Sequence, residues 1–176
     1  TLSDKNYKFN AIVIGKRLLK TDGLDINDTI MGKSSIYTNN EWIYTKSMPN
    51  NKFNHKVEKI NEKIYVIGGS DELDIPQSHI ISYNYTNNSW YTEINLLKSM
   101  SNHDITNIND NIYIINGLDN GNNNNSITYR LYSYDSTQTN LNIDFENYVN
   151  SISLGNIFLP DENNLAYSKK LSLNTN

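Results

Sequence analysis

The chain has 176 residues, of which 37% are hydrophobic and 19% charged, and its formal net charge is −4. This length allows a globular domain with a buried core, and the acidic pI of about 5.3 argues against a nucleic-acid partner, which would require a basic face. The absence of cysteine excludes a disulfide framework and thiol catalysis, and no apolar run is long enough to predict a membrane-spanning segment or a membrane partner.

The first quarter of the chain has weak signals for regular structure. Residues 1–8 are polar and are expected to be a lead-in or linker. The apolar segment 11–15 predicts a buried strand, 17–33 predicts a long loop, and two strands are predicted at 34–37 and 42–45. Within the loop, Asp22, Asp25 and Asp28 lack the ligand spacing and terminal Glu of a calcium loop, so we expect a solvated loop without metal.

One stretch occurs twice in the middle of the chain. Residues 54–69 are repeated by residues 102–117, so that His55 recurs as His103 and Ile64 as Ile112. Each copy predicts a strand, a polar turn and a second strand. The run 64–67 is apolar without alternation, which predicts a strand buried on both faces. A repeat of this length is typical of a β-propeller.

The segments after each copy predict the rest of a repeat. The first copy is followed by a loop at 70–78 and by strands at 80–85 and 89–96. The second is followed by an Asn-rich tract at 120–125, expected to be a mobile loop, and by a strand at 131–135. A further start is predicted at 157–159, where Pro160 takes the place of the glycines.

These segments resemble the kelch motif. Residues 64–69 end in Gly68 and Gly69, and they are followed by Tyr83 and then by Trp90. The resemblance implies an all-β, kelch-type β-propeller over residues 9–176, with repeats starting near 11, 64 and 112 and a remnant near 157. It would be incomplete, with about three four-stranded blades plus the remnant, whereas propellers close with about four to eight blades. Three alternatives are open for the bare blade faces: the chain is a piece of a longer propeller, it covers these faces by self-association, or its degenerate end repeats have been made polar. The weak motifs in the first and last repeats favour the third alternative.

Most distinctive residues are interpreted as structural. The motif positions are Gly68, Gly69, Tyr83, Trp90 and Trp42, and His55 and His103 are expected to close hydrogen bonds between adjacent blades. The histidines lack metal-ligand spacing, and no phosphate loop or nucleophile elbow is present. We therefore predict no enzyme, no catalytic residue, no metal and no cofactor.

The resemblance also implies where a partner would bind. Kelch propellers bind through the loops that join the second strand to the third and the fourth strand to the next blade. On this chain, the candidate partner-binding residues are Asp71, Glu72, Asp74, Gln77, Asp119 and Asn120 on the first kind of loop, and Lys46, Asn50, Lys98 and Ser101 on the second.

The predicted function is a non-enzymatic protein–protein interaction module. Kelch domains commonly belong to BTB-kelch adaptors that recruit substrates to ubiquitin ligases, and the chain resembles a shortened poxvirus-type kelch-like protein. The resemblance implies host proteins or ligase substrates as partners, and a cytoplasmic location, in the host cell if the chain is viral. Two alternatives stay open: a secreted or surface carbohydrate-binding propeller that uses Trp42 or Trp90, and a degenerate fragment without a partner.

Overall fold

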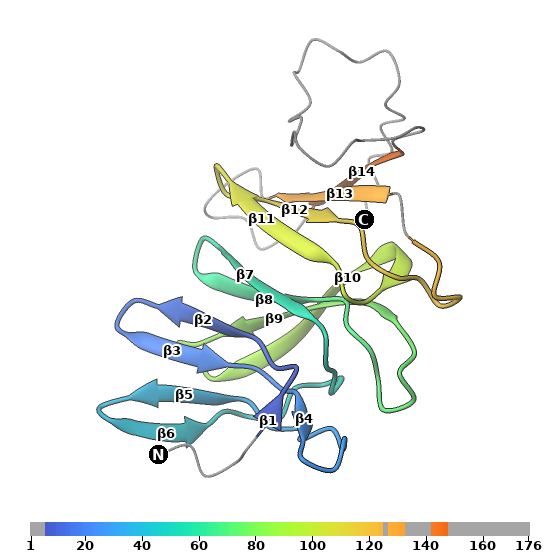
Figure 1. Ribbon diagram of the computed structural model, residues 1–176. Helices are drawn as coiled ribbons and strands as arrows, with labels where there is room; N and C mark the ends of the chain where they lie inside the picture. The colour runs from blue at the N-terminus through green and yellow to red at the C-terminus, as the bar shows by residue number, and fades with distance from the viewer. Residues whose placement is uncertain (1–5, 125–126, 133–141, 148–176) are drawn as a thin grey trace.

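The computed structural model describes residues 6–124, 127–132 and 142–147. All regular structure in these ranges is β, and most of it belongs to three four-stranded antiparallel sheets. No helix capable of crossing a membrane is found among these residues. The sheets confirm the predicted all-β class (Figure 1).

We call the three four-stranded sheets blades 1, 2 and 3; blades 2 and 3 are built from consecutive strands, and in blade 1 only β4 (Leu24–Asp25) intervenes. A separate two-stranded ribbon pairs β1 (Asn6–Tyr7), inside the predicted lead-in, with β4. The blades contain, in order, β2 (Ala11–Ile14), β3 (Arg17–Lys20), β5 (Ser35–Thr38) and β6 (Glu41–Tyr44); β7 (Lys56–Ile60), β8 (Lys63–Ile67), β9 (Gln77–Asn84) and β10 (Ser89–Met100); and β11 (Asp104–Ile108), β12 (Asn111–Ile115), β13 (Ile127–Tyr132) and β14 (Asn142–Asn147).

The blades follow one another as successive layers, with their first strands closest together. Strand β7 contacts β2 on one side and β11 on the other. The first strands therefore form a common inner edge, and Figure 1 shows the three sheets stacked in chain order. This is the arrangement of neighbouring propeller blades, in which each sheet packs face to face on the next.

Strand β8 explains why an unbroken apolar run is needed between two layers. Ile64 and Val66 belong to the apolar cluster shared with blade 1, whereas Tyr65 and Ile67 belong to the cluster shared with blade 3. All four side chains are at most 4% exposed. Because successive side chains of a strand point to opposite faces, only a run without alternation fills both layers, so the predicted two-sided burial is confirmed.

The prediction for the first repeat was wrong in its strand assignment. The expected loop at 17–33 contains β3 and β4, and the apolar segment at 11–14 is the first strand of blade 1, not the second. Position 23 of this blade corresponds to Gly69 of blade 2. The signal was hidden because the end of β3 and the residues after it are polar yet buried: Lys20, Thr21 and Asp22 are at most 5% exposed.

In blade 3, the strand predicted at 131–135 is observed as β13, which already begins at Ile127. Several predicted features lie outside the described residues: the end of this strand at 133–135, Leu141 at the position of the motif Trp, and the remnant at 157–159.

Candidate binding face

The same loop follows the second strand in each of the three blades, and an aspartate holds it in shape. Asp71 Oδ1 accepts hydrogen bonds from the backbone N–H groups of Leu73 and Ile75, both at 3.0 Å. Asp25, its counterpart in blade 1, accepts from residues 27 and 29 at 2.8 and 2.9 Å. Asp119, its counterpart in blade 3, accepts from residues 121 and 123 at 2.8 and 3.0 Å. Asp side chains favour such local turns.

The main chain of these loops also repeats. In blade 2, the N–H of Asp71 donates to the Ile75 carbonyl at 3.1 Å, and the N–H of Asp74 donates to the Asp71 carbonyl at 3.0 Å. Asp28, Asp74 and Asn122 occupy corresponding positions and have φ of 60°, 57° and 56°. Residues 119–123, in the Asn-rich tract expected to be mobile, therefore form the same hydrogen-bonded turn as the other two loops.

The loops of blades 1 and 2 carry exposed aliphatic side chains at their tips, whereas the loop of blade 3 has only polar residues and glycine. Ile26 is 79% exposed and Leu73 is 74% exposed, and Ile75 lies beside the second tip at 38%. These residues were missed by sequence reasoning, because an isolated aliphatic residue in a polar loop has no periodic signal. The available signal was an aliphatic residue inside a short turn that begins with Asp.

A hollow of about 430 Å³ lies between the starts of the three inner strands. Its wall contains Asn10, Asn54 and Asn102 together with their neighbours, and it is predominantly polar. The N–H of Asn54 donates to the Lys8 carbonyl at 3.3 Å, and the N–H of Asn102 donates to the Asn54 carbonyl at 3.4 Å. The φ angles of Lys8, Asn54 and Asn102 are 51° to 53°, so each blade has one residue in the left-handed conformation here. The two backbone hydrogen bonds between these residues link each blade to the next.

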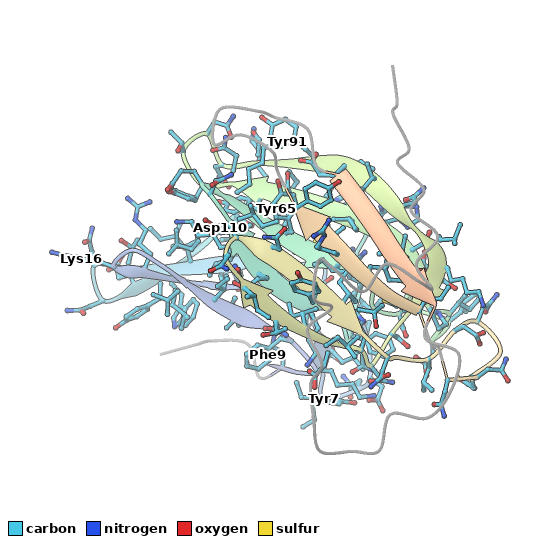
Figure 2. The ribbon with its side chains drawn as sticks, turned by 90° about the horizontal axis from the view of Figure 1, so that it is seen from above. Tyr7, Phe9, Lys16, Tyr65, Tyr91 and Asp110 are labelled. Atoms are coloured by element: carbon cyan, nitrogen blue, oxygen red, sulfur yellow. The ribbon has the colours of Figure 1, made fainter. Side chains whose placement is uncertain are left out.

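The hollow and the three loops lie at the same end of the strands, since each inner strand begins where the second strand of its blade ends. We call this end, with loops 25–29, 71–75 and 119–123 and the hollow, the loop face. Figure 2 shows Tyr7 and Phe9 near one end of the first hairpin and Lys16 at its opposite tip. The charges inside the hollow are mixed, because Lys56 Nζ lies 3.0 Å from Asp104 Oδ1.

The two repeated histidines lie in the wall of the hollow and are buried, at 3% and 1% exposure. His55 Nε2 lies 2.7 Å from Thr21 Oγ1, so this histidine makes a hydrogen bond between blades 1 and 2. His103 does not make the corresponding bond, and neither ring nitrogen has a hydrogen-bond partner among the described residues. Burial lowers the pKa of His55 to about 3 and that of His103 to about 4. Both rings are therefore neutral at pH 7.

A buried carboxylate holds the connection between blades 1 and 2. Asp22 is fully buried and accepts hydrogen bonds from the backbone N–H groups of Gly23, Gly32 and Lys52 at 2.8 to 3.0 Å. Burial raises its pKa despite these hydrogen bonds. The expectation that Asp22 lies in a solvated loop was wrong, because its carboxylate is buried and accepts hydrogen bonds from backbone N–H groups.

Lys52 is a second buried charged residue that the sequence did not reveal. It is fully buried, its Nζ donates to the His79 carbonyl at 3.3 Å, and burial lowers its pKa to about 8.

The described residues contain no group of three or more His, Cys, Asp or Glu side chains placed to hold a metal ion.

The structure brings most of the predicted partner-binding residues to the loop face. Asp71, Glu72, Asp74, Gln77, Asp119 and Asn120 lie on or beside its loops. Ser101 pairs through its backbone with Leu118 but is only 3% exposed. Lys98 is on strand β10, not on a loop, and its charge contributes to lowering the pKa of Asp119, after the backbone hydrogen bonds.

Lys46 lies elsewhere. Its backbone N–H donates to Asn88 Oδ1 at 3.1 Å and its carbonyl accepts from Trp90 Nε1 at 2.8 Å, which places it beside the β9–β10 turn at the other end of the strands. Asn50 is half-buried in the connection between blades 1 and 2.

Trp90 and Trp42 pack within their blades. The Trp90 ring centroid lies 4.6 Å from that of Tyr83, and the Trp42 centroid lies 5.3 Å from that of Tyr37. Neither tryptophan lies on the three loops of the loop face, so a carbohydrate site built on them would be separate from it.

Asp71→Ala is expected to unfold the blade 2 loop locally while the blade stays folded. The change removes the acceptor for two backbone N–H groups, a loss of about 1–2 kcal/mol of local stability. In hydrogen exchange followed by NMR, the Leu73 and Ile75 amides should exchange at least ~5-fold faster, and the Ile64–Ile67 amides should be unaffected. Unchanged exchange at Leu73 and Ile75 would mean that the aspartate does not hold the loop. Glu72→Ala, which removes an exposed carboxylate from the same loop without changing a residue of positive φ, is the control.

Comparisons with known proteins agree with this architecture. Residues 52–93, which contain blade 2 up to the middle of its last strand, match the family model described as the Kelch motif. The solved structure titled "Structure of YjhT" is similar, with a TM-score of 0.71 at 15% identity. The similarity covers 86% of this chain and 54% of the YjhT chain, so this chain spans about half of that structure. The sequence matches no curated protein. The chain has the fold of an incomplete kelch-type propeller.

Proposed function

We propose that this protein is a non-enzymatic protein-interaction module that binds its partner on the loop face. The observation that carries the proposal is the threefold use of one Asp-held loop beside a polar hollow. Loops held on a rigid scaffold are the usual place for binding residues. The kelch motif in residues 52–93 supports the same class of function, because kelch repeats generally mediate protein–protein interaction.

The chemistry of the loop face favours a protein surface as ligand. Ile26 and Leu73 present aliphatic side chains that are 79% and 74% exposed, and Glu72 and Asp74 surround the second of them with carboxylates. Exposed aliphatic anchors beside polar groups are typical of protein interfaces, in which a few anchors contribute most of the binding energy. The hollow provides Asn side chains and backbone groups for hydrogen bonds at the centre of the face.

The low pKa values of His55 and His103 support a non-enzymatic role. A general base or acid is most effective when its pKa lies near the working pH. These two rings line the hollow, but their pKa values of about 3 and 4 make neither suited to proton transfer at pH 7.

The proposal extends to the biological role that the kelch resemblance implies. In this role the protein acts in the cytoplasm, that of a host cell if the chain is viral, and recruits substrates for a BTB-kelch type of ubiquitin-ligase adaptor. Co-purification of a cullin together with the loop-face partner would support the adaptor role. A reproducible partner without any cullin would leave the interaction function intact and remove the ligase role.

Ile26→Asp combined with Leu73→Asp is expected to weaken partner binding by at least ~10-fold. Both changes remove exposed aliphatic anchors, and one such anchor commonly contributes more than about 1 kcal/mol. Lys16→Glu, at the far tip of the β2–β3 hairpin, changes an exposed residue outside the loop face and serves as the control. The measurement is affinity capture from cell lysate, followed by titration of the captured partner with each purified variant.

The proposal predicts a partner that the control retains and the double variant loses. A partner held equally by both variants would contradict binding on the loop face. Binding to a glycan array that survives the loop changes would instead favour the carbohydrate alternative.

A further inference from the structure

Blade 1 has an open face that corresponds to an interface used twice in the same chain. In blade 2, Ile64 and Tyr83 pair across β8 and β9 and pack against blade 1, where they are 0% and 1% exposed. In blade 3, Ile112 and Leu131 pair in the same way and pack against blade 2, both at 0%. Each blade therefore presents what we call a near face to the blade before it.

The near face of blade 1 keeps the same row of side chains. Val13, Leu18, Tyr37 and Trp42 pair with one another across β2, β3, β5 and β6. They point away from blade 2, because the alternate residues Ile12, Ile14, Leu19 and Ile36 pack against it. Tyr37 is 37% exposed and Val13 is 66% exposed. Val13 stands where blade 2 has Lys59 and blade 3 has Asn107, so the open near face carries an additional aliphatic residue.

Blade 3 presents the complementary side, which we call the far face. In blade 2, the far-face residues Ile60, Tyr65 and Ile67 are at most 4% exposed because they pack in the layer shared with blade 3. The corresponding positions of blade 3 are Ile108, Tyr113 and Ile115, and all three are only half-buried. Within the part of the chain that the structure describes, no further blade covers the near face of blade 1 or the far face of blade 3, and surfaces of these two kinds already pack together twice.

We propose that two copies of this chain associate by packing the near face of blade 1 of each copy on the far face of blade 3 of the other. A twofold axis generates two identical contacts of this type and closes a ring of six blades, a number within the range of closed propellers. The structural similarity agrees with this size, since one chain spans 54% of the YjhT chain. The dimer leaves the loop face free and does not depend on the proposed partner binding.

Size-exclusion chromatography with light scattering tests the association. The wild-type protein is expected to have twice the chain mass of 20.2 kDa and a melting temperature that rises with protein concentration. Val13→Asp combined with Tyr37→Asp places two charges on the near face and should reduce the mass to that of one chain. The matched control is Ile26→Asp combined with Leu73→Asp, which should remain dimeric because both residues lie on the loop face.

Mixing variants distinguishes loss of the interface from loss of folding. Tyr113→Asp alters the far face and should also be monomeric alone. An equimolar mixture with the near-face variant retains one unaltered contact per pair, so a dimer should reappear at high concentration.

A compact wild-type monomer with a concentration-independent melting temperature would overturn the proposal, as would a dimer that the near-face variant leaves intact. A mass that grows without limit as concentration rises would overturn the closed ring, because the contacts would then propagate into an open chain.

Discussion

Gly69→Ala is expected to lower the free energy of unfolding by at least ~3 kcal/mol and the melting temperature by roughly 10 °C. Gly69 has φ of +95°, a region that residues with a Cβ rarely adopt. An added Cβ would lie 2.7 Å from the Phe53 carbonyl oxygen and 2.8 Å from the Cβ of His55. Both neighbours belong to the connection into β7, so the clash cannot be relieved by rotating a side chain.

Gly15→Ala is the matched control. Gly15 also has positive φ, at +57°, but no heavy atom lies within 4 Å of an added Cβ. It should therefore lose only about 1 kcal/mol, from the backbone conformation alone. Urea denaturation of the two variants checks the difference. An equal loss of unfolding free energy in Gly69→Ala and Gly15→Ala would show that the close packing around Gly69 is not the reason for a glycine at this position.

Lowering the pH from 6.5 to 4.5 is expected to destabilise the fold through His55 and His103. An unfolded histidine takes up a proton below about pH 6.5, whereas the rings of the folded protein stay neutral until about pH 3 and pH 4. The unfolded state therefore binds more protons in this window, so stability falls as the pH falls. Each ring contributes up to about 1.4 kcal/mol per pH unit, and about 2 kcal/mol over the two units because the unfolded histidine is already half protonated at pH 6.5.

Urea titrations at half-unit pH intervals between 7 and 4.5 measure this dependence. His103→Gln should reduce the slope of unfolding free energy against pH by about half, because Gln does not titrate. This holds even if the variant has a different absolute stability. His55→Gln should act similarly but also weakens the hydrogen bond to Thr21. A slope that persists unchanged in both variants would assign the acid sensitivity to other groups.

The central blade could be predicted from sequence because its second strand, β8, is buried on both faces by apolar side chains alone. The run 64–67 fills two layers, and its near-copy at 112–115 identified the repeat. Strand β3 was missed for the opposite reason. Its last residue, Lys20, is 5% exposed, and its Nζ donates to Asn6 Oδ1 at 3.0 Å. A pattern that treats every Lys as solvated cannot find such a position.

The loop face was located by the family resemblance, but the roles of its residues were not. Asp71 and Asp119 were selected as contacts for a partner, and their side chains hold backbone N–H groups of their own loops. Such a bond depends on the loop conformation, which composition does not specify. The residues that project most, Ile26 and Leu73, are set by the same turns, so neither could be identified before the turn was known.

The sheets have a further consequence for how such a chain changes in evolution. Each four-stranded sheet is made of strands that follow closely in the chain, with only β4 intervening in blade 1, and the ladder hydrogen bonds of the three blades never cross from one blade to the next in the described residues. Duplication or deletion of one whole unit therefore preserves these ladders and disturbs only the packing and the few hydrogen bonds between neighbouring units, which the units satisfy in a similar way. Genes for chains of this kind can gain or lose copies in single steps, and the close likeness of residues 54–69 and 102–117 is what such a duplication leaves behind.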